Sequence, residues 1–282
     1  MKLVRFGPAG TERPGLVDAQ GRIRDLSAHV DDIAGKALSD EGLARIAALD
    51  PASLPLVEES TRIGPCVGQV GKFVCIGLNY SDHAAEAGLD VPPEPIVFMK
   101  ATSAICGPDD GIELPRGSLA TDWEVELAVV IGRHAKYVSE ADALSHVAGY
   151  CVANDVSERD FQTKRAGQWT KGKSADTFGP LGPWLVTRDE VSDPQALSLW
   201  LDLNGKRMQT GSTATMIFGV AKVISYLSQM MSLHPGDVIS TGTPPGVGMG
   251  IKPAPVYLKP GDRLALGIDG LGTQTQLVRA AD

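Results

Sequence analysis

Residues 122–127 (DWEVEL) alternate acidic and apolar side chains and run directly into the apolar segment 128–131 (AVVI). Because side chains alternate along a β-strand, Asp122, Glu124 and Glu126 are expected to share one face. The apolar continuation on both faces is typical of a strand that enters a hydrophobic core, so the acidic end should border the interior. Buried carboxylates need protonation, basic partners or a cation. The segment therefore predicts a buried strand that carries a charged site.

The residue types in this acidic row indicate which cation would suit it. Every candidate ligand is a carboxylate oxygen, with no His or Cys interleaved, and such hard ligands favour magnesium, manganese or calcium. Asp155 is a further candidate ligand, because it follows the apolar segment 150–153 (YCVA) in a similar way. The alternative interpretation is an edge strand whose charges prevent pairing with other chains. In that case Asp155 would belong to a turn or a cap.

The composition limits the class of protein. The 282 residues are 43% hydrophobic and 21% charged, as in a folded globular protein. No apolar run approaches the ~20 residues of a membrane helix, and the net charge of −8 includes no basic cluster for nucleic acid. Neither a membrane nor a nucleic acid is an expected partner. Glycine (32) and proline (19) together exceed their usual share of about 12%, so many short strands and turns are expected.

Hydrophobic patterns predict an α+β chain that is mostly β. Pro51, Pro55 and Pro65 punctuate a linker, so residues 1–68 are expected to form a small N-terminal domain and residues 69–282 a larger domain with the acidic row. Strands are predicted at 2–6, 14–18, 22–26, 72–77, 96–99, 123–131 and 150–154. Helices are predicted at 40–49, from the capping box at 139–142 to Gly149, and along the apolar stripe from Met216 to Met230.

The N-terminus and the cysteines bear on location. Residues 1–6 (MKLVRF) lack the pattern of a secretory signal or a transit peptide, which favours the cytoplasm. The cysteines show no C-x-x-C pair and no zinc spacing, so they are expected to be buried, reduced thiols. They are Cys66, Cys75, Cys106 and Cys151.

His83 and Glu86 form an H-x-x-E pair. Residues three apart share one face of a helical turn, so the carboxylate can orient the imidazole and raise its basicity. The pair follows a predicted buried strand and precedes Gly88, which suits a segment that closes over a site. The alternative is an ordinary pair on the surface of a helix.

Two other segments carry groups suited to an anionic substrate. Lys171 and Lys173, in the sequence KGKS, can supply an ammonium group, and in an extended segment both would point to the same side. Residues 241–248 (TGTPPGVG) offer hydroxyls and backbone amides to a carboxylate. The alternatives are a solvated basic turn and a plain loop. The glycine spacing is not G-x-G-x-x-G, so no dinucleotide site is expected.

These segments together resemble the fumarylacetoacetate hydrolase family. The matching pieces are GLNYSDHAAE at 77–86, FMK at 98–100, DWEVELAVVIG at 122–132, ANDVSERDFQ at 153–162, WTKGKSADTFGPLGPW at 169–184 and STGTPPGVG at 240–248, in the order of the family. The stretch GSTATMIFGV at 211–220 resembles the bacterial 2,4-diketo-3-deoxy-L-fuconate or rhamnonate hydrolase branch. The resemblance implies a rolled, mixed β-sheet core and a homodimer.

The resemblance also implies roles for individual residues. The implied ligands of Mg²⁺ or Mn²⁺ are Glu124, Glu126 and Asp155. The implied catalytic residues are His83 and Glu86, as a dyad on a lid, with Lys173 and Gln162. The implied substrate-binding residues are Lys100, Arg159, Tyr80, Thr241, Gly242 and Thr243. The family motif often has a bulkier residue at Ala175, and this departure, with Lys171 nearby, leaves the choice of lysine open.

The implied activity is metal-dependent hydrolysis of a C–C bond in a 2,4-diketo acid, giving pyruvate and a carboxylic acid. The substrate would be an acylpyruvate or a 2,4-diketo-3-deoxy sugar acid, the latter in sugar acid catabolism. Ureidoglycolate cleavage, oxaloacetate decarboxylation and tautomerisation are alternatives on the same site. A non-catalytic scaffold, in which the ion only ties strands together, is a different class of hypothesis and predicts metal binding without turnover.

Overall fold

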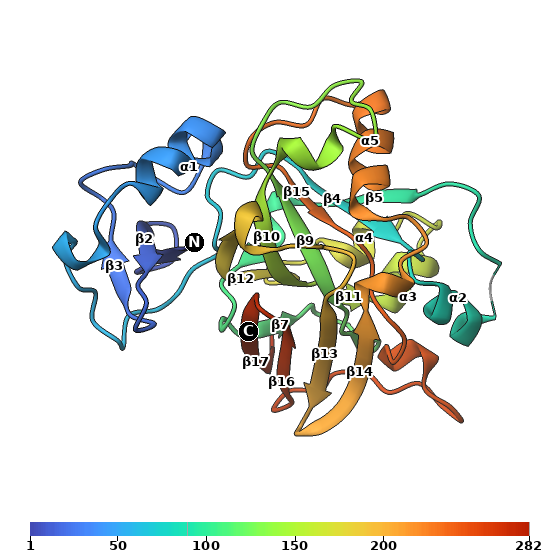
Figure 1. Ribbon diagram of the computed structural model, residues 1–282. Helices are drawn as coiled ribbons and strands as arrows, with labels where there is room; N and C mark the ends of the chain where they lie inside the picture. The colour runs from blue at the N-terminus through green and yellow to red at the C-terminus, as the bar shows by residue number, and fades with distance from the viewer. Residues whose placement is uncertain (89, 282) are drawn as a thin grey trace.

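The computed structural model describes residues 1–88 and 90–281 and shows an α+β protein dominated by strands (Figure 1). Within those residues, the strands of the larger sheet are β1 (Lys2–Phe6), β2 (Arg13–Val17), β3 (Ile23–Asp25), β4 (Phe73–Gly77), β5 (Ile96–Lys100), β6 (Ile105–Cys106), β9 (Val125–Ile131), β10 (Val147–Asn154), β12 (Gly179–Thr187) and β15 (Val238–Ser240). Those of the smaller sheet are β7 (Ile112–Leu114), β13 (Ser198–Leu203), β14 (Lys206–Ser212), β16 (Arg263–Ile268) and β17 (Gly272–Ala280). The short strands β8 (Thr121–Asp122) and β11 (Ser157–Glu158) pair with each other.

The helices are short and lie around these sheets. The α-helices are α1 (Asp40–Ala47), α2 (Ser81–Ala87), α3 (Arg159–Thr163), α4 (Thr170–Lys173) and α5 (Val220–Met230). The 3-10 helices are η1 (Gly35–Leu38), η2 (Pro51–Ser53), η3 (Thr102–Ala104), η4 (Ala143–His146), η5 (Arg188–Glu190), η6 (Thr213–Thr215) and η7 (Gly248–Gly250). No helix in the described part of the chain combines the length and the apolar character needed to cross a membrane.

The larger sheet is mixed and has the order β3-β2-β1-β12-β10-β9-β15-β4-β5, with β6 beside β12. Strands β15 and β4 run parallel to each other, whereas β9 is antiparallel to both of its neighbours, β10 and β15. The smaller sheet has the order β14-β13-β16-β17-β7. The mostly β, α+β class predicted from the sequence is therefore confirmed.

The N-terminal strands extend the larger sheet rather than forming one of their own. Strand β1 pairs with β12, with Lys2 opposite Val186 and Leu3 opposite Leu185. The predicted N-terminal strands and the helix near residue 40 are confirmed, and Figure 1 shows them together at one end of the molecule. Whether residues 1–68 form a domain in the folding sense stays a prediction.

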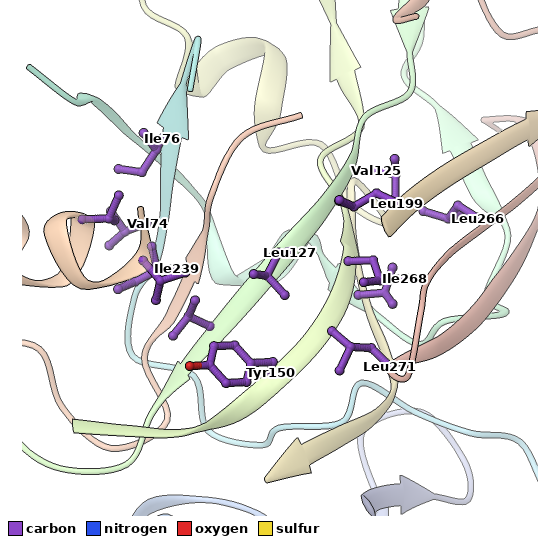
Figure 2. Packing of buried hydrophobic residues seen from close by; sticks show 14 of the residues in the cluster. Val74, Ile76, Val125, Leu127, Tyr150, Leu199, Ile239, Leu266, Ile268 and Leu271 are labelled. Atoms are coloured by element: carbon purple, nitrogen blue, oxygen red, sulfur yellow. The ribbon is translucent and has the colours of Figure 1, made fainter. Parts of the chain in front are cut away.

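The apolar run of β9 is explained by packing on both of its faces. Val129 and Ile131 belong to a cluster shared with the smaller sheet and α5. Ala128 and Val130 belong to a second cluster, which includes apolar residues of the N-terminal strands such as Leu3. Figure 2 shows the first cluster between β9 and the smaller sheet. The strand is buried on both sides, as its sequence predicts.

The helix predicted from residue 139 to Gly149 is wrong. Ser139 and Asp142 do bond to each other, but the turn continues only as the 3-10 helix η4. Gly149 lies inside β10, where a Cβ atom would stand 2.2 Å from the carbonyl oxygen of Val186. The glycine therefore allows two strands to approach closely, a tertiary requirement that resembles a helix-ending signal in the sequence.

Two other boundaries differ from the prediction. Helix α5 begins at Val220 rather than Met216, because Asn79 bonds to the backbone amides of Ile217 and Phe218 and keeps that segment out of the helix. The strand expected over 123–131 begins at Val125, since β8 and β9 are separate elements. The four cysteines are buried and unpaired, as expected.

Candidate active site

Strands β9 and β10 bring three carboxylates together at one end of their ladder. Glu126 lies on β9, Glu124 just before it, and Asp155 just after β10. The register places Ala153 opposite Glu126, and the amide of Asp155 donates to the carbonyl of Glu124 at 2.9 Å. All three residues are buried, and one carboxylate oxygen of each lies within 4.8 Å of the others. The backbone ladder thus fixes the cluster.

Two buried lysines contact the cluster. The Nζ atom of Lys173, on α4, donates to Oε2 of Glu124 and to Oδ2 of Asp155, both at 2.7 Å. The Nζ atom of Lys100, at the end of β5, donates to Oδ1 of Asp155 and to the carbonyl of Val156. Asp155 therefore has an ammonium group on each oxygen.

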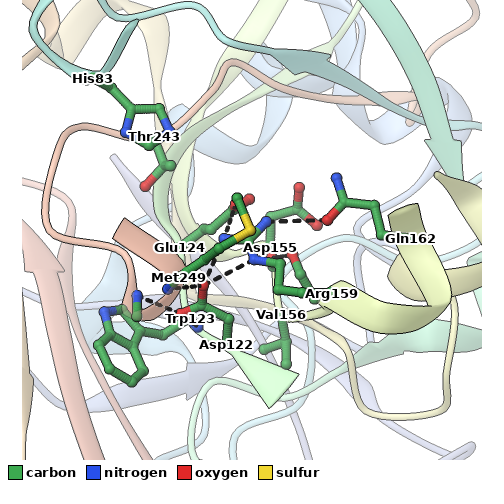
Figure 3. Close-up of polar contacts among 12 residues, drawn as sticks. His83, Asp122, Trp123, Glu124, Asp155, Val156, Arg159, Gln162, Thr243 and Met249 are labelled. Atoms are coloured by element: carbon green, nitrogen blue, oxygen red, sulfur yellow. Dashed lines mark hydrogen bonds and ion pairs between the residues drawn. The ribbon is translucent and has the colours of Figure 1, made fainter. Parts of the chain in front are cut away.

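The structure corrects the predicted row of three carboxylates on one face. The chain leaves the strand between β8 and β9, and Asp122 is not part of the acidic cluster of Glu124, Glu126 and Asp155. Its carboxylate accepts hydrogen bonds from the amides of Gly248 and Met249 at 2.6 and 2.9 Å. It also pairs with Arg159 at 2.8 Å, and the same guanidinium contacts Glu124 at 2.7 Å (Figure 3). Asp122 therefore ties a loop to the site instead of joining the cluster.

The surroundings drive the pKa values of the two glutamates apart. Burial acts to raise the pKa of Glu124, but the charges of Lys173 and Arg159 outweigh it and lower that pKa to about 2. Burial and the negative charges of Asp155 and Glu124 raise the pKa of Glu126 well above its usual value. The charged form of Glu126 is therefore the one that lacks compensation.

The contacts of Glu126 show why. Its Oε2 atom accepts hydrogen bonds from the hydroxyl of Ser240 and, at 2.9 Å, from the amide of Gly242, and no ion pair reaches it from the described residues. The buried network as a whole has one more carboxylate than cations. Its carboxylates are Asp122, Glu124, Glu126 and Asp155, and its cations are Lys100, Arg159 and Lys173. An excess negative charge among hard oxygen donors fits a divalent cation.

The predicted dyad lies on α2, across a cavity of about 220 Å³ from the cluster. His83 lines this cavity, and its Nδ1 atom lies 3.3 Å from Oε2 of Glu86. The same oxygen of Glu86 accepts the amide of Gly246 at 3.2 Å. A hydrogen bond of 3.3 Å between Thr215 and Asp82 also anchors α2. These contacts leave the other ring nitrogen of His83 available to the cavity.

Gln162 and part of the 241–243 segment also line the cavity. Gln162 accepts a hydrogen bond from Arg159 at 3.1 Å through Oε1, so its amide nitrogen remains available as a donor. Gly242 and Thr243 line the wall, whereas Thr241 is fully buried and donates its hydroxyl to a backbone carbonyl. The structure thus brings only two of these three residues to the cavity.

The remaining candidates divide between the cavity and the interior. Lys173 reaches the cavity, while Lys171 is exposed and donates to a backbone carbonyl, because the two lysines sit on a helical turn rather than on an extended segment. Lys100 contacts the cluster from behind the cavity wall. Tyr80 is fully buried outside the lining, and its hydroxyl has no hydrogen-bond partner in the described structure.

Comparison with known proteins places this geometry in a family. The model of the fumarylacetoacetate (FAA) hydrolase C-terminal domain matches residues 72–279. The chain belongs to the fumarylacetoacetate hydrolase family. A relative from Burkholderia multivorans is 69% identical over 281 residues, with 100% of both chains covered.

Two solved structures of the family bear on the chemistry. The 2-hydroxyhepta-2,4-diene-1,7-dioate isomerase of Mycobacterium marinum is 33% identical, covers 99% of this chain and 98% of its own, and has a TM-score of 0.74. The maleylpyruvate hydrolase of Sphingobium sp. SYK-6, in complex with manganese(II) and pyruvate, is 29% identical, covers 100% of both chains and has a TM-score of 0.82. The family therefore includes both hydrolases and isomerases.

Sequence reasoning did not find the apolar wall of the cavity. This wall consists of Leu78, Phe98, Trp169, Val247 and Met249. The rings of Phe98 and Trp169 lie 5.4 Å apart, and a Cβ atom on Gly77 would stand 2.4 Å from the Trp169 ring. The family motifs quoted above contain four of these five residues, all but Met249, but apolar residues in such motifs resemble ordinary core residues. Only the fold shows that they line the cavity.

Proposed function

We propose that this member of the fumarylacetoacetate hydrolase family is a metal-dependent enzyme that hydrolyses the C3–C4 bond of a 2,4-diketo acid to pyruvate and a carboxylic acid. The observation that carries the proposal is that the buried cluster of Glu124, Glu126 and Asp155 and the imidazole of His83 line the same cavity. The manganese and pyruvate in the related maleylpyruvate hydrolase structure support both the cofactor and the product.

The residues of the cluster fit Mg²⁺ or Mn²⁺. Three carboxylates supply hard oxygen ligands, and the ionised form of Glu126 has no ion-pair partner among the described residues to balance it. When bound, the ion supplies positive charge that stabilises the negative charge developing on the oxygen at C2 of the substrate. Lys173 holds Glu124 and Asp155 in place, and Lys100 holds Asp155.

The dyad supplies the base for the hydrolytic step. Glu86 accepts from one ring nitrogen of His83 and so directs the other toward the cavity, where it takes a proton from water. The resulting hydroxide adds to C4. As the C3–C4 bond breaks, its electron pair moves onto C3, which then takes up a proton to give pyruvate, while the acyl group leaves as a carboxylic acid.

Two donors face the C4 oxygen in this arrangement. Gln162 accepts a hydrogen bond from Arg159 through Oε1, and this contact orients the side chain so that its amide nitrogen can donate to the substrate. Lys173 uses two of its three N–H donors on Glu124 and Asp155, which leaves the third for the substrate. Fixed donors of this kind stabilise the oxyanion that forms when hydroxide adds.

A turnover panel tests the proposal. Acylpyruvates, 2,4-diketo-3-deoxy sugar acids, oxaloacetate and ureidoglycolate are incubated with the protein and Mg²⁺ or Mn²⁺, and pyruvate release is measured for those substrates that can yield it, alongside loss of substrate for all. We expect an acylpyruvate or a diketo sugar acid to be cleaved, with no turnover after chelation. Full activity in the presence of a chelator would refute the role of the metal. Tight metal binding without turnover of any substrate would favour the scaffold hypothesis.

A second candidate function is decarboxylation or tautomerisation of a 2-keto acid on the same cluster. The related dioate isomerase supports it, because such reactions also pass through an enolate and need no added water. The presence of His83 in the cavity favours hydrolysis. Replacing His83 by Ala separates the two, since it should stop hydrolysis much more than a reaction that consumes no water.

A further inference from the structure

The lining of the cavity has two chemically different parts. One part is the acidic cluster together with Arg159 and Lys173, and the rest consists of apolar and uncharged groups with His83. The apolar groups are Ile76, Leu78, Phe98, Trp169, Val247 and Met249. Figure 3 shows Met249 extending over the cluster from the loop that Asp122 anchors. A substrate whose keto-acid end binds at the cluster therefore directs its acyl end toward an apolar wall.

The cations of the lining are already bound to protein carboxylates. Arg159 contacts Asp122 and Glu124, and Lys173 contacts Glu124 and Asp155. Lys173 also lies 5.0 Å from the centroid of the Phe98 ring. Among the described residues that line the cavity, there is no lysine or arginine besides these two. A carboxylate at the far end of a substrate would lose water there without gaining an ion pair, which is costly.

The net charge of the buried network of carboxylates and cations around the cluster also disfavours a second carboxylate on the substrate. Its buried carboxylates exceed its buried cations by one, so a divalent ion would leave one positive charge in excess. A single substrate carboxylate neutralises that charge. A second carboxylate would place an unbalanced negative charge in the same cavity as Glu124, Glu126 and Asp155.

Basic residues near the cavity do not supply a partner for a carboxylate on the acyl end. Lys164 is exposed and pairs with Asp160 at 2.8 Å, and the Arg165 guanidinium stacks on the Phe161 ring at 4.0 Å. Lys171 is exposed and bonds to the backbone. None of the three lines the cavity, so they can attract anions to this region but do not accompany a bound acyl end.

We propose that the site selects 2-keto acids with one carboxylate and an uncharged, apolar acyl end, and that it discriminates against acyl ends that carry a carboxylate. This inference rests on the proposed hydrolase function and narrows its substrate class. Phe98, Trp169 and Met249 specify the preference, because they belong to the apolar wall that an acyl end meets.

A matched pair of substrates tests the preference. 2,4-Dioxoheptanoate and 2,4-dioxoheptanedioate share the reacting atoms and the number of carbons, and they differ in the terminal methyl or carboxylate. With Mn²⁺ present, we expect kcat/KM to be at least ~100-fold higher for the monocarboxylate, mainly through a lower KM. Comparable values, or a preference for the dicarboxylate, would overturn this inference while leaving the hydrolase function intact. Absence of metal-dependent cleavage of either compound would overturn the function itself, and this inference with it.

A variant of the wall tests the assignment of the residues. Met249→Lys adds a cation to the apolar wall, and we expect it to reduce the preference for the monocarboxylate by at least ~10-fold by lowering the KM of the dicarboxylate. Met249→Leu is the matched control and should retain the preference of the original protein. If Met249→Lys leaves the ratio unchanged while thermal unfolding shows an intact fold, the wall does not contact the acyl end and the inference is wrong.

Discussion

Two almost fully buried carboxylates, in different parts of the molecule, have opposite surroundings. Asp18, directly after β2, accepts hydrogen bonds from the amides of Gln20 and Arg22 and pairs with Arg22 and Arg24 at 3.2 and 2.8 Å. Burial acts to raise its pKa, but these partners outweigh burial and lower the pKa to about 2. The charge of Asp18 is thus fully matched within the N-terminal region.

Glu126 has none of these cationic partners. Its hydrogen bonds come from a hydroxyl and an amide, and the neighbouring charges of Asp155 and Glu124 are negative. A buried carboxylate with cationic partners, such as Asp18, stabilises the fold by itself. A buried carboxylate without them, such as Glu126, is stabilised only when a cation binds to it. The difference separates a structural carboxylate from a ligand-binding one, and it can be tested by removing each charge.

Glu126→Gln should have the largest effect on activity. Loss of the charge removes a metal ligand, so we expect kcat/KM with Mn²⁺ to fall by roughly 10³-fold or more and metal binding, measured by calorimetry, to weaken strongly. The unfolding temperature of the metal-free protein should not fall, because the substitution relieves repulsion from Asp155 and Glu124. Retained activity, or a large loss of stability without metal, would contradict this assignment of Glu126.

Asp18→Asn is the matched control for that experiment. The change has the same chemistry but removes a carboxylate that is bound to two arginines far from the cavity. We expect unchanged kcat/KM and metal affinity, with a lower unfolding temperature. If both variants lose activity to a similar degree, the contrast between the two carboxylates has no functional meaning.

His83→Ala should have the next largest effect. The imidazole faces the cavity but has no contact with the cluster, so its loss should lower kcat for hydrolysis by about 10²-fold and leave KM and metal affinity nearly unchanged. Glu86→Gln should cost less, because it removes the group that orients the base rather than the base. An unchanged rate in the His83 variant would exclude it from the mechanism.

The sequence predicts the candidate metal ligands better than it predicts the hydrogen bonds and ion pairs around them. Glu124, Glu126 and Asp155 follow from strand patterns and from the family resemblance, and antiparallel pairing of β9 with β10 brings them together. The role of Asp122 does not follow, because its partners Gly248 and Met249 lie more than 120 residues away. Local alternation cannot show that the chain leaves the strand at this point.

Predicted secondary-structure elements and side-chain directions were wrong where a distant contact overrides a local sequence pattern. The turn at 139–142 has the composition of a helix start, yet Gly149 is needed for close packing of β10 against β12. Lys171 and Lys173 look equivalent in the sequence, and only the helical turn α4 sends one to the cluster and the other to solvent. Such contacts depend on the completed fold, so no short window of sequence contains them.

The smallest effect is expected on stability in acid. The pKa of Asp18 is about 2 in the folded protein, against an ordinary value of 3.8. Its contribution to stability is therefore fully present above about pH 4 and is lost as the pH falls toward 2. The difference in urea midpoint between the original protein and Asp18→Asn should accordingly be constant from pH 7 to about pH 5 and shrink progressively below about pH 4. A difference that stays constant down to pH 3 would mean that Asp18 is not paired with its arginines in solution. Asp18 would then no longer serve as the structural carboxylate with which Glu126 is compared.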